Sequence, residues 1–266
     1  PPSSEAPFHL GIYKVRPDLK AIIHAHPGAL VSFSICSQVP DTRVFPEAFN
    51  VCGKVAFAPY ALPGSQQLGD HIAKQFASDA QPSCVVLENH GVVCGGADLA
   101  ETFAIFETLE FTALTIINAS RLGPVEYLDT TIIERIQASR KALPEACAEA
   151  PSSREKELRK EICEFIHRAY QHRLITSTWG SFSARIDTES FLITPTHMDR
   201  ELLSVEDLIV VRNGQIDAGT QPSRAVQVHA AIYAAHPEIQ SIVNALPVHA
   251  TAFSISQCKL DTRTIP

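Results

Sequence analysis

Apolar residues recur with two different spacings along this chain, and the spacing predicts helices interspersed with short strands. The longest helical pattern covers 97–121, where Phe103, Phe106 and Leu109 mark one apolar face. Short apolar runs bounded by turn residues predict strands. Helices are expected at 8–17, 28–37, 66–79, 97–121, 132–143 and 155–171, and strands at 21–26, 54–60, 84–88, 91–96, 182–186, 191–194, 208–211 and 214–216. The mixture predicts an α/β fold.

Composition narrows the class of protein. Hydrophobic residues make up 45% and charged residues 19% of 266 positions, enough core for one large domain or two modest ones. The net charge is -7, and Lys and Arg are scattered, so we expect no nucleic acid partner. No apolar run approaches the roughly 18 residues of a membrane span, so we expect no membrane partner. Seven cysteines without a CxxC pair predict reduced thiols and a cytoplasmic location.

An internal repeat is visible in the sequence. Residues 2–46 align without a gap on residues 222–266, each with the residue 220 positions later. The identical pairs include His9/His229, Ile12/Ile232, Tyr13/Tyr233, Pro17/Pro237, Ala25/Ala245, Pro27/Pro247, Asp41/Asp261, Arg43/Arg263 and Pro46/Pro266.

The repeat predicts two partial copies of one fold. Residues 1–150 are expected to hold the C-terminal part of one copy, and residues 151–266 the N-terminal part of the next. A linker rich in Pro and Ser is expected at 143–153. Equal copies would need about 65 residues before Pro1 and about 115 after Pro266. A truncated, cleaved or partly ordered tandem chain is favoured over a circular permutation, which would not duplicate a segment.

Three histidines and one glutamate are candidates for a chemical site. His24 and His26 stand two residues apart on a predicted strand and therefore point to the same face. His90 follows the strand 84–88, and Gly91 after it permits a tight turn. Glu5 immediately precedes a helix. Taken singly, these residues are equally typical of core or surface histidines, a turn histidine and a helix-start acid.

The second copy helps to decide between those alternatives, because it keeps neighbouring residues such as Ala25 and Pro27 and replaces His24, His26 and Glu5. Packing alone therefore does not require two histidines and a glutamate at these positions. His9 is kept as His229, so we assign His9 to helix structure and not to a metal. We expect no equivalent metal site in the second copy, where the replacements are His24/Asn244, His26/Leu246 and Glu5/Ala225.

Nearly the whole chain resembles the class II aldolase/adducin family. The matching stretches in 2–122 include Pro2-Ser3-Ser4-Glu5, His24-Ala25-His26, Ala58-Pro59-Tyr60-Ala61 and Asn89-His90-Gly91. Residues 156–266 resemble the first half of the family through Gly180-Ser181-Phe182-Ser183-Ala184-Arg185 and Leu192-Ile193-Thr194-Pro195. The resemblance implies an α/β/α fold with a central, mainly antiparallel sheet covered by helices, in two partial copies.

The resemblance also implies the roles of the candidate residues. Zinc, or another divalent transition metal, would be held by His24, His26 and His90. Glu5 would contact the resting metal and then act as the base beside a carbonyl. Ser3 and Ser4 would help to hold a substrate phosphate. The chemistry agrees, because three neutral ligands leave zinc an open position from which it can stabilise an enediolate.

The chain departs from the family pattern at several positions. Phe45 stands where the aldolase has a tyrosine that supplies a proton to the aldehyde, and 128–155 contain no evident replacement for a second one. In the second copy, Gly180-Ser181 replaces the family's Gly-Asn and His197 replaces a glycine. These changes affect the substrate and leave the metal ligands intact.

The expected function is a zinc-dependent, aldolase-type lyase on a small hydroxy-carbonyl compound or sugar phosphate, acting through an enediolate. Phe45 gives weight to the alternatives of an epimerase, dehydratase or decarboxylase. A non-catalytic adducin-like binding or assembly module is the alternative of another class. The family also implies a homo-oligomer.

Overall fold

The computed structural model describes residues 3–138 and 142–264 and divides the chain into two compact units. The first unit comprises Pro1–Ile136 with Val248–Pro266, and the second comprises Gln137–Pro247. Each unit contains its own sheet and its own hydrophobic core, and each is described by itself.

A four-stranded sheet forms the centre of the first unit. Its order is β1 (Ala21–Ala25), β4 (Gly91–Gly96), β3 (Cys84–Leu87) and β2 (Val55–Ala58). β4 runs antiparallel to both β1 and β3, whereas β2 and β3 are parallel. The order makes β1 an edge strand in the described part of the sheet.

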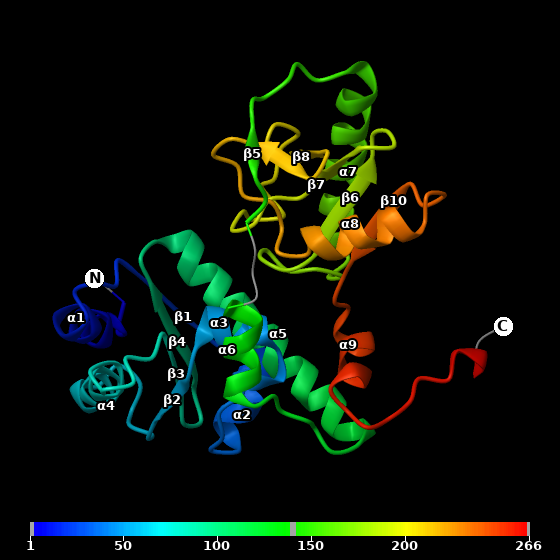
Figure 1. Cartoon of the computed structure of the whole chain (residues 1–266). Helices are drawn as coiled ribbons and strands as arrows, with labels where there is room; N and C mark the ends of the chain where they lie inside the picture. Colours follow the sequence, from blue (N-terminus) through cyan, green and yellow to red (C-terminus); the bar gives the residue numbers. More distant parts are fainter. Residues whose placement is uncertain (1–2, 139–141, 265–266) are drawn as a thin grey trace. The chain divides into compact units, whose positions relative to one another are not determined.

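Helices cover both faces of this sheet. Figure 1 shows α1 (Ala6–Val15) and α4 (Gln66–Phe76) on one side, with α2 (Gly28–Ile35), α3 (Pro46–Cys52) and α5 (Leu99–Leu122) on the other. Successive strand residues point to opposite faces, so Val85 packs with the first pair of helices and Val86 with the second group. The unit also contains the short helices η1 (Thr42–Val44) and η2 (Thr262–Thr264), together with α6 (Thr130–Ala138). The last α-helix, α9 (Val248–Ser254), packs against α5.

The second unit has a six-stranded sheet. Its order is β10 (Ser241–Asn244), β6 (Ser181–Arg185), β7 (Ser190–Ile193), β8 (Ile209–Arg212), β9 (Gln215–Asp217) and β5 (Glu145–Ala146). All neighbours are antiparallel except β9 and β5. α7 (Ser153–Gln171) packs with Leu192 and Val210, while α8 (Val226–Ala235) packs with Phe191 and Val211, so the two helices lie on opposite faces.

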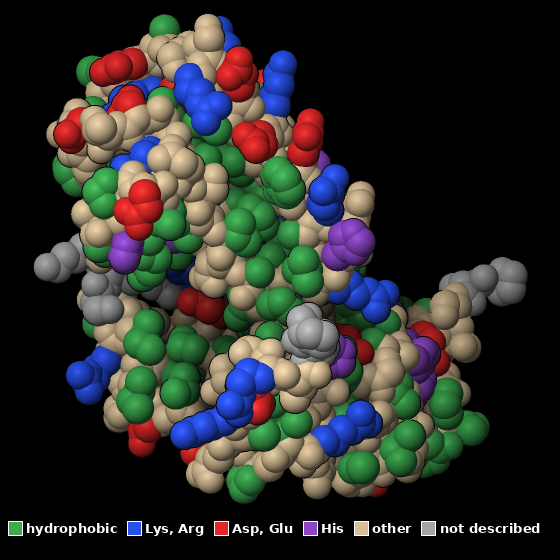
Figure 2. Space-filling model, turned by 90° about the vertical axis from the view of Figure 1, so that its right-hand side faces the viewer, with side chains coloured by type: hydrophobic (Ala, Val, Ile, Leu, Met, Phe, Trp, Pro, Cys, Tyr) green, Lys and Arg blue, Asp and Glu red, His purple; other side chains and the backbone are tan. Residues whose placement is uncertain are grey.

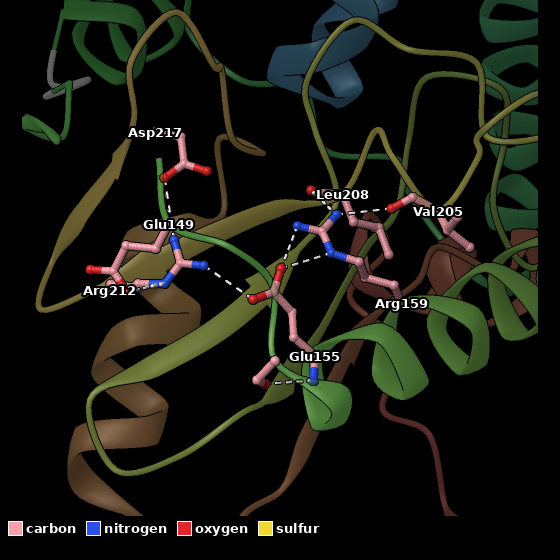
Figure 3. Close-up of polar contacts among 8 residues, drawn as sticks. Glu149, Glu155, Arg159, Val205, Leu208, Arg212 and Asp217 are labelled. Atoms are coloured by element: carbon pink, nitrogen blue, oxygen red, sulfur yellow. Dashed lines mark hydrogen bonds and ion pairs between the residues drawn. The ribbon is translucent and has the colours of Figure 1, made fainter. Parts of the chain in front are cut away.

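A buried carboxylate ties α7 to this sheet (Figure 3). Glu155 Oε1 accepts hydrogen bonds from Arg159 Nε at 2.9 Å and Nη2 at 2.7 Å, and Glu155 Oε2 accepts one from Arg212 Nη2 at 3.1 Å. Arg212 of β8 also contacts Asp217 of β9 at 3.2 Å. The network therefore links the first turn of α7 with two strands.

The helices and mixed sheets agree with the predicted α/β class. Of the predicted helix 132–143, residues 132–138 belong to α6 and residues 142–143 are not helical; residues 139–141 lie outside the described residues, as do Pro2 and Pro266 of the repeat. The predicted linker 143–153 contains the short strand β5. The copy boundaries 1–150 and 151–266 stay a prediction. The two compact units show which residues pack together, whereas the two copies are defined by the sequence repeat.

Surface charge, helix hydrophobicity and the state of the cysteines can each be described briefly. On the face drawn in Figure 2, acidic and basic side chains are scattered among one another. Within the described residues, no helix combines the length and the apolar character that crossing a membrane requires. All seven cysteines are free thiols.

Candidate metal centre

Three histidines from two distant parts of the chain meet in the first unit. His24 lies on β1, His26 follows that strand, and His90 stands in the turn between β3 and β4. Their ring centroids are 4.7 Å apart for His24 and His26, and 4.9 Å for each of the two other pairs. The possible ligand atoms of all three lie within 4.8 Å of one another. The structure thus brings together the three predicted imidazoles.

The nitrogen atoms of these rings fit a cation. His24 Nδ1 lies 2.9 Å from the backbone oxygen of Val92, which makes Nδ1 the donor and leaves a lone pair on Nε2. His24 Nε2 and His90 Nδ1 are both buried, and neither has a hydrogen-bond partner among the described residues. Buried polar atoms are normally satisfied, so two such atoms in one cluster are the expected sign of a site for an electron-pair acceptor.

The electrostatics keep His24 and His90 in the form that binds metal. The pKa of His24 is lowered to about 4, chiefly by burial and also by the neighbouring His90 and His26, against the opposing hydrogen bond to the backbone oxygen of Val92. Burial also lowers the pKa of His90, while Glu5 raises it. Neutral imidazole is the state that ligates zinc-class ions, so near neutral pH no proton must leave these two rings first.

Glu5 lies close to the centre without joining the three-histidine cluster. It occupies the N-cap position of α1, and its charge partly offsets the burial that lowers the pKa of both His90 and His9. Its Oε2 atom is buried and has no hydrogen-bond partner among the described residues. A carboxylate oxygen in that state is available to accept a proton or to approach a cation.

Ser3 and Ser4 are exposed next to Glu5. Ser3 Oγ accepts a hydrogen bond from the backbone N–H of Glu5 at 3.2 Å, and Ser4 lies so near Gly64 that a Cβ atom there would be 3.2 Å from Cβ of Ser4. Their expected part in phosphate binding stays a prediction.

Gly91 is required for close packing. A Cβ atom at this position would lie 2.5 Å from the backbone oxygen of Ala25 and 2.8 Å from Cδ2 of His26. The left-handed conformation of the turn belongs to Asn89, with φ 51°. The glycine thus lets β4 approach β1 closely enough for His26 and His90 to meet, which differs from the turn role expected from sequence.

Two further glutamates position the centre and were not found from the sequence. Glu88 Oε2 accepts a hydrogen bond from the backbone N–H of Tyr60, and Oε1 accepts one from Ser37 Oγ, which holds the turn before His90. Glu110 on α5 accepts hydrogen bonds from the backbone N–H groups of Ala29 and Leu30. It therefore caps α2, the helix that follows His26. Neither residue has a local sequence signal, because both act across the fold.

The departures from the family pattern have clear positions. Phe45 is buried against Phe111, with ring centroids 6.2 Å apart. His197 has φ 55°, in the left-handed region that favours glycine. The backbone at this position therefore has the conformation of the glycine expected from the family pattern. The second-unit counterparts of the candidate residues, Asn244, Leu246 and Ala225, offer no imidazole or carboxylate.

Comparison with known proteins identifies the family. Residues 1–117 and 160–265 match the profile of the Class II Aldolase and Adducin N-terminal domain. An L-fuculose phosphate aldolase of Methanocaldococcus jannaschii is 35% identical over 119 residues, covering 44% of this chain and 62% of that protein. A 3-oxo-tetronate 4-phosphate decarboxylase of Haemophilus influenzae is 35% identical over 116 residues, covering 42% of this chain and 54% of that protein.

A solved L-fuculose 1-phosphate aldolase is 32% identical with a TM-score of 0.45, covering 50% of this chain and 61% of that structure. The chain therefore spans less than two thirds of the length of these relatives. The profile match extends over most of the chain, in two segments. The chain belongs to the class II aldolase and adducin family.

Proposed function

We propose that the first unit is the catalytic half of a metal-dependent lyase acting on a small phosphorylated hydroxy-carbonyl compound. The observation that carries the proposal is the convergence of His24, His26 and His90, with one buried, unsatisfied ring nitrogen each on His24 and His90. The names of the relatives support the substrate class, since both curated relatives act on sugar-type phosphates. We further propose zinc as the metal, two partial copies of one fold as the architecture, and a homo-oligomer as the assembly.

The protein residues have separate roles in this proposal. The three histidines would hold a zinc-class ion, which would supply a Lewis acid for the substrate carbonyl. Val92 fixes the ring of His24 through its backbone oxygen, which keeps Nε2 directed into the centre. Carbon–carbon cleavage leaves an enediolate, and Glu5 in its protonated form gives a proton to the carbon beside the carbonyl; in the reverse, condensing direction Glu5 takes that proton as a base. Ser3 and Ser4, exposed beside Glu5, bind the phosphate.

The group that leaves in carbon–carbon cleavage divides the proposal into two candidates. Aldol cleavage needs a group that takes the proton of the substrate hydroxyl as this becomes the aldehyde oxygen, and Phe45 has no hydroxyl that could exchange it. Decarboxylation releases a carboxylate as carbon dioxide, with no hydroxyl proton to remove, and does not need that group. Because a decarboxylase is among the 35% identical relatives, we keep decarboxylation as the second candidate.

Replacing Glu5 tests the chemistry. We expect Glu5→Gln to lower turnover of L-fuculose 1-phosphate or 3-oxo-tetronate 4-phosphate at least about 100-fold, the usual contribution of a general base. Zinc content should not change, because Glu5 is outside the three-histidine cluster. Coupled assays of aldehyde and of carbon dioxide separate the two candidates.

The matched control is Glu161→Gln, an exposed glutamate of α7, which should keep full turnover. Equal turnover in Glu5→Gln and the parent chain would remove Glu5 from the mechanism. Zinc loss in Glu5→Gln would instead make it a ligand.

A further inference from the structure

Two helices related by the sequence repeat bury opposite faces. α1 and α8 are 220 positions apart, and they share His9/His229, Ile12/Ile232 and Tyr13/Tyr233. Phe8 on α1 is 2% exposed, whereas its counterpart Val228 is 60% exposed. Tyr13 on α1 is 38% exposed, whereas its counterpart Tyr233 is 5% exposed. Each helix therefore has two packing faces, and each unit covers only one of them.

The covered face of α8 carries a specific polar arrangement. Buried His229 accepts or donates hydrogen bonds on both ring nitrogens, with Ser181 Oγ at 2.9 Å and Ser183 Oγ at 2.7 Å. Ser183 Oγ also lies 2.8 Å from the hydroxyl of Tyr233. Both serines belong to β6, so this strand satisfies the histidine and the tyrosine of the helix together.

A third side chain of β6 completes the arrangement. The Arg185 guanidinium lies over the ring of Tyr233, with its carbon 4.5 Å from the ring centroid. It also donates to the backbone oxygen of Tyr233 at 2.8 Å and of Ile239 at 2.9 Å, at and beyond the C-terminal end of α8. Ser181, Ser183 and Arg185 alternate along the strand and therefore share one face. The Ser-x-Ser-x-Arg pattern of β6 thus places its three side chains against His229 and Tyr233 of α8.

The first unit presents the same helix face without such a strand. Among the described residues, no hydrogen bond reaches the ring nitrogens of His9 or the hydroxyl of Tyr13. Leu10 on the same face is 60% exposed, and its counterpart Ala230 packs against the second core. A histidine kept in both copies is thus satisfied in one unit and open in the other.

The adjoining strand is open as well. β1 is the counterpart of β10, and β10 pairs with β6 through Ser241/Ala184, Ile242/Ser183, Val243/Phe182 and Asn244/Ser181. β1 pairs with β4 on one side, and among the described residues no strand pairs with its other edge. By the repeat, a strand of the β6 type would place its first serine opposite His24.

We propose that the α1–β1 face of the first unit is a docking surface for a polypeptide segment of the type of residues 153–221. The Ser-x-Ser-x-Arg strand of that segment adds to the free edge of β1. Its serines bind His9 and Tyr13, and its arginine covers Tyr13 and the end of α1. The proposal stands on the repeat and on the hydrogen bonds of β6, and it does not depend on a metal or on the proposed reaction.

An extended chain tests this proposal. A copy of residues 153–221 is placed directly before Pro2 of the full chain, in place of Pro1, at the position that the repeat assigns to it. Hydrogen exchange is then measured on peptides covering 6–16 and 21–25, which are distinct in sequence from the added segment. We expect exchange in 21–25 to slow at least 10-fold, together with loss of access of Tyr13 to iodination.

The control extension carries Ser181→Val, Ser183→Val and Arg185→Ala in the added segment alone. These changes keep residues that suit a β-strand and remove the side chains that would bind His9 and Tyr13, so the slower hydrogen exchange of 21–25 should be lost. Unchanged exchange in the first extension overturns the proposal, as does equal protection by both extensions. A dimer of the unextended chain by light scattering, with 21–25 already protected, overturns it in favour of a second copy on this edge.

Discussion

At the scale of single residues, the candidate metal centre depends on atoms that sequence patterns do not identify. The two-residue spacing of His24 and His26 on a strand was predicted, and so was the position of His90 after a buried strand. The roles of the Val92 backbone oxygen and of the missing side chain at Gly91 were not predicted, because both come from the pairing of β1 with β4. Sequence thus predicted the candidate ligands, and the tertiary fold supplies their orientation.

The close approach at Gly91 makes a specific prediction. Gly91→Ala should weaken zinc binding at least 10-fold and lower the free energy of unfolding by about 1–3 kcal/mol, the usual cost of overpacking. The reason is that the new methyl group would displace the Ala25 backbone and the His26 ring. Isothermal titration with zinc and urea unfolding measure the two effects. Gly28→Ala is the control, since a Cβ there meets nothing within 4 Å; similar behaviour of the two variants would refute the packing argument.

His229 predicts how the stability of the second unit depends on pH. Burial lowers its pKa from 6.5 to about 4, so the folded state holds this ring neutral where the unfolded chain protonates it. The stabilisation is complete above pH 6.5 and is lost as pH falls from 6.5 through about 4, by at most about 1.4 kcal/mol for each pH unit. Urea unfolding followed by the fluorescence of Trp179, the one tryptophan of the chain, measures this slope. A His229→Gln variant with the same slope as the parent would contradict the assignment.

At the scale of elements, the sequence predicted the helices and strands with a clear apolar pattern and missed short ones that depend on their neighbours. β4 has the predicted bounds 91–96, and α5 differs from its predicted range by two residues at its start and one at its end. The seven-residue helix α3 was missed, because it is short and begins at Pro46. The two-residue strand β5 was missed because it exists only through its pairing with β9.

The link between α7 and the second sheet gives a prediction at this scale. Glu155→Gln should lower the free energy of unfolding by roughly 3 kcal/mol, because it removes the one carboxylate that both Arg159 and Arg212 share in a buried place. Glu157→Gln on the same helix is the control, since its contact with Arg154 is exposed and should contribute about 0.5 kcal/mol or less. Urea unfolding followed by Trp179 fluorescence compares them, and equal losses would show that the network is not what stabilises α7.

At the scale of the whole molecule, the two units bury complementary parts of one repeated pattern. The α1 face that binds α4 in the first unit corresponds to the exposed face of α8, and the buried face of α8 corresponds to the exposed face of α1. The repeat itself was visible in the sequence. The complementary burial was not, because it depends on which strands each helix meets.

The central claim is that the three histidines hold one metal ion, and metal analysis of the purified full chain tests it most directly. We predict about one zinc per chain, with X-ray absorption giving three imidazole nitrogens near 2.0–2.1 Å. His26→Ala should lose the zinc, whereas His249→Ala, an exposed histidine outside the cluster, should keep it. A parent chain without stoichiometric metal, or a His26→Ala variant that retains it in full, would contradict the account.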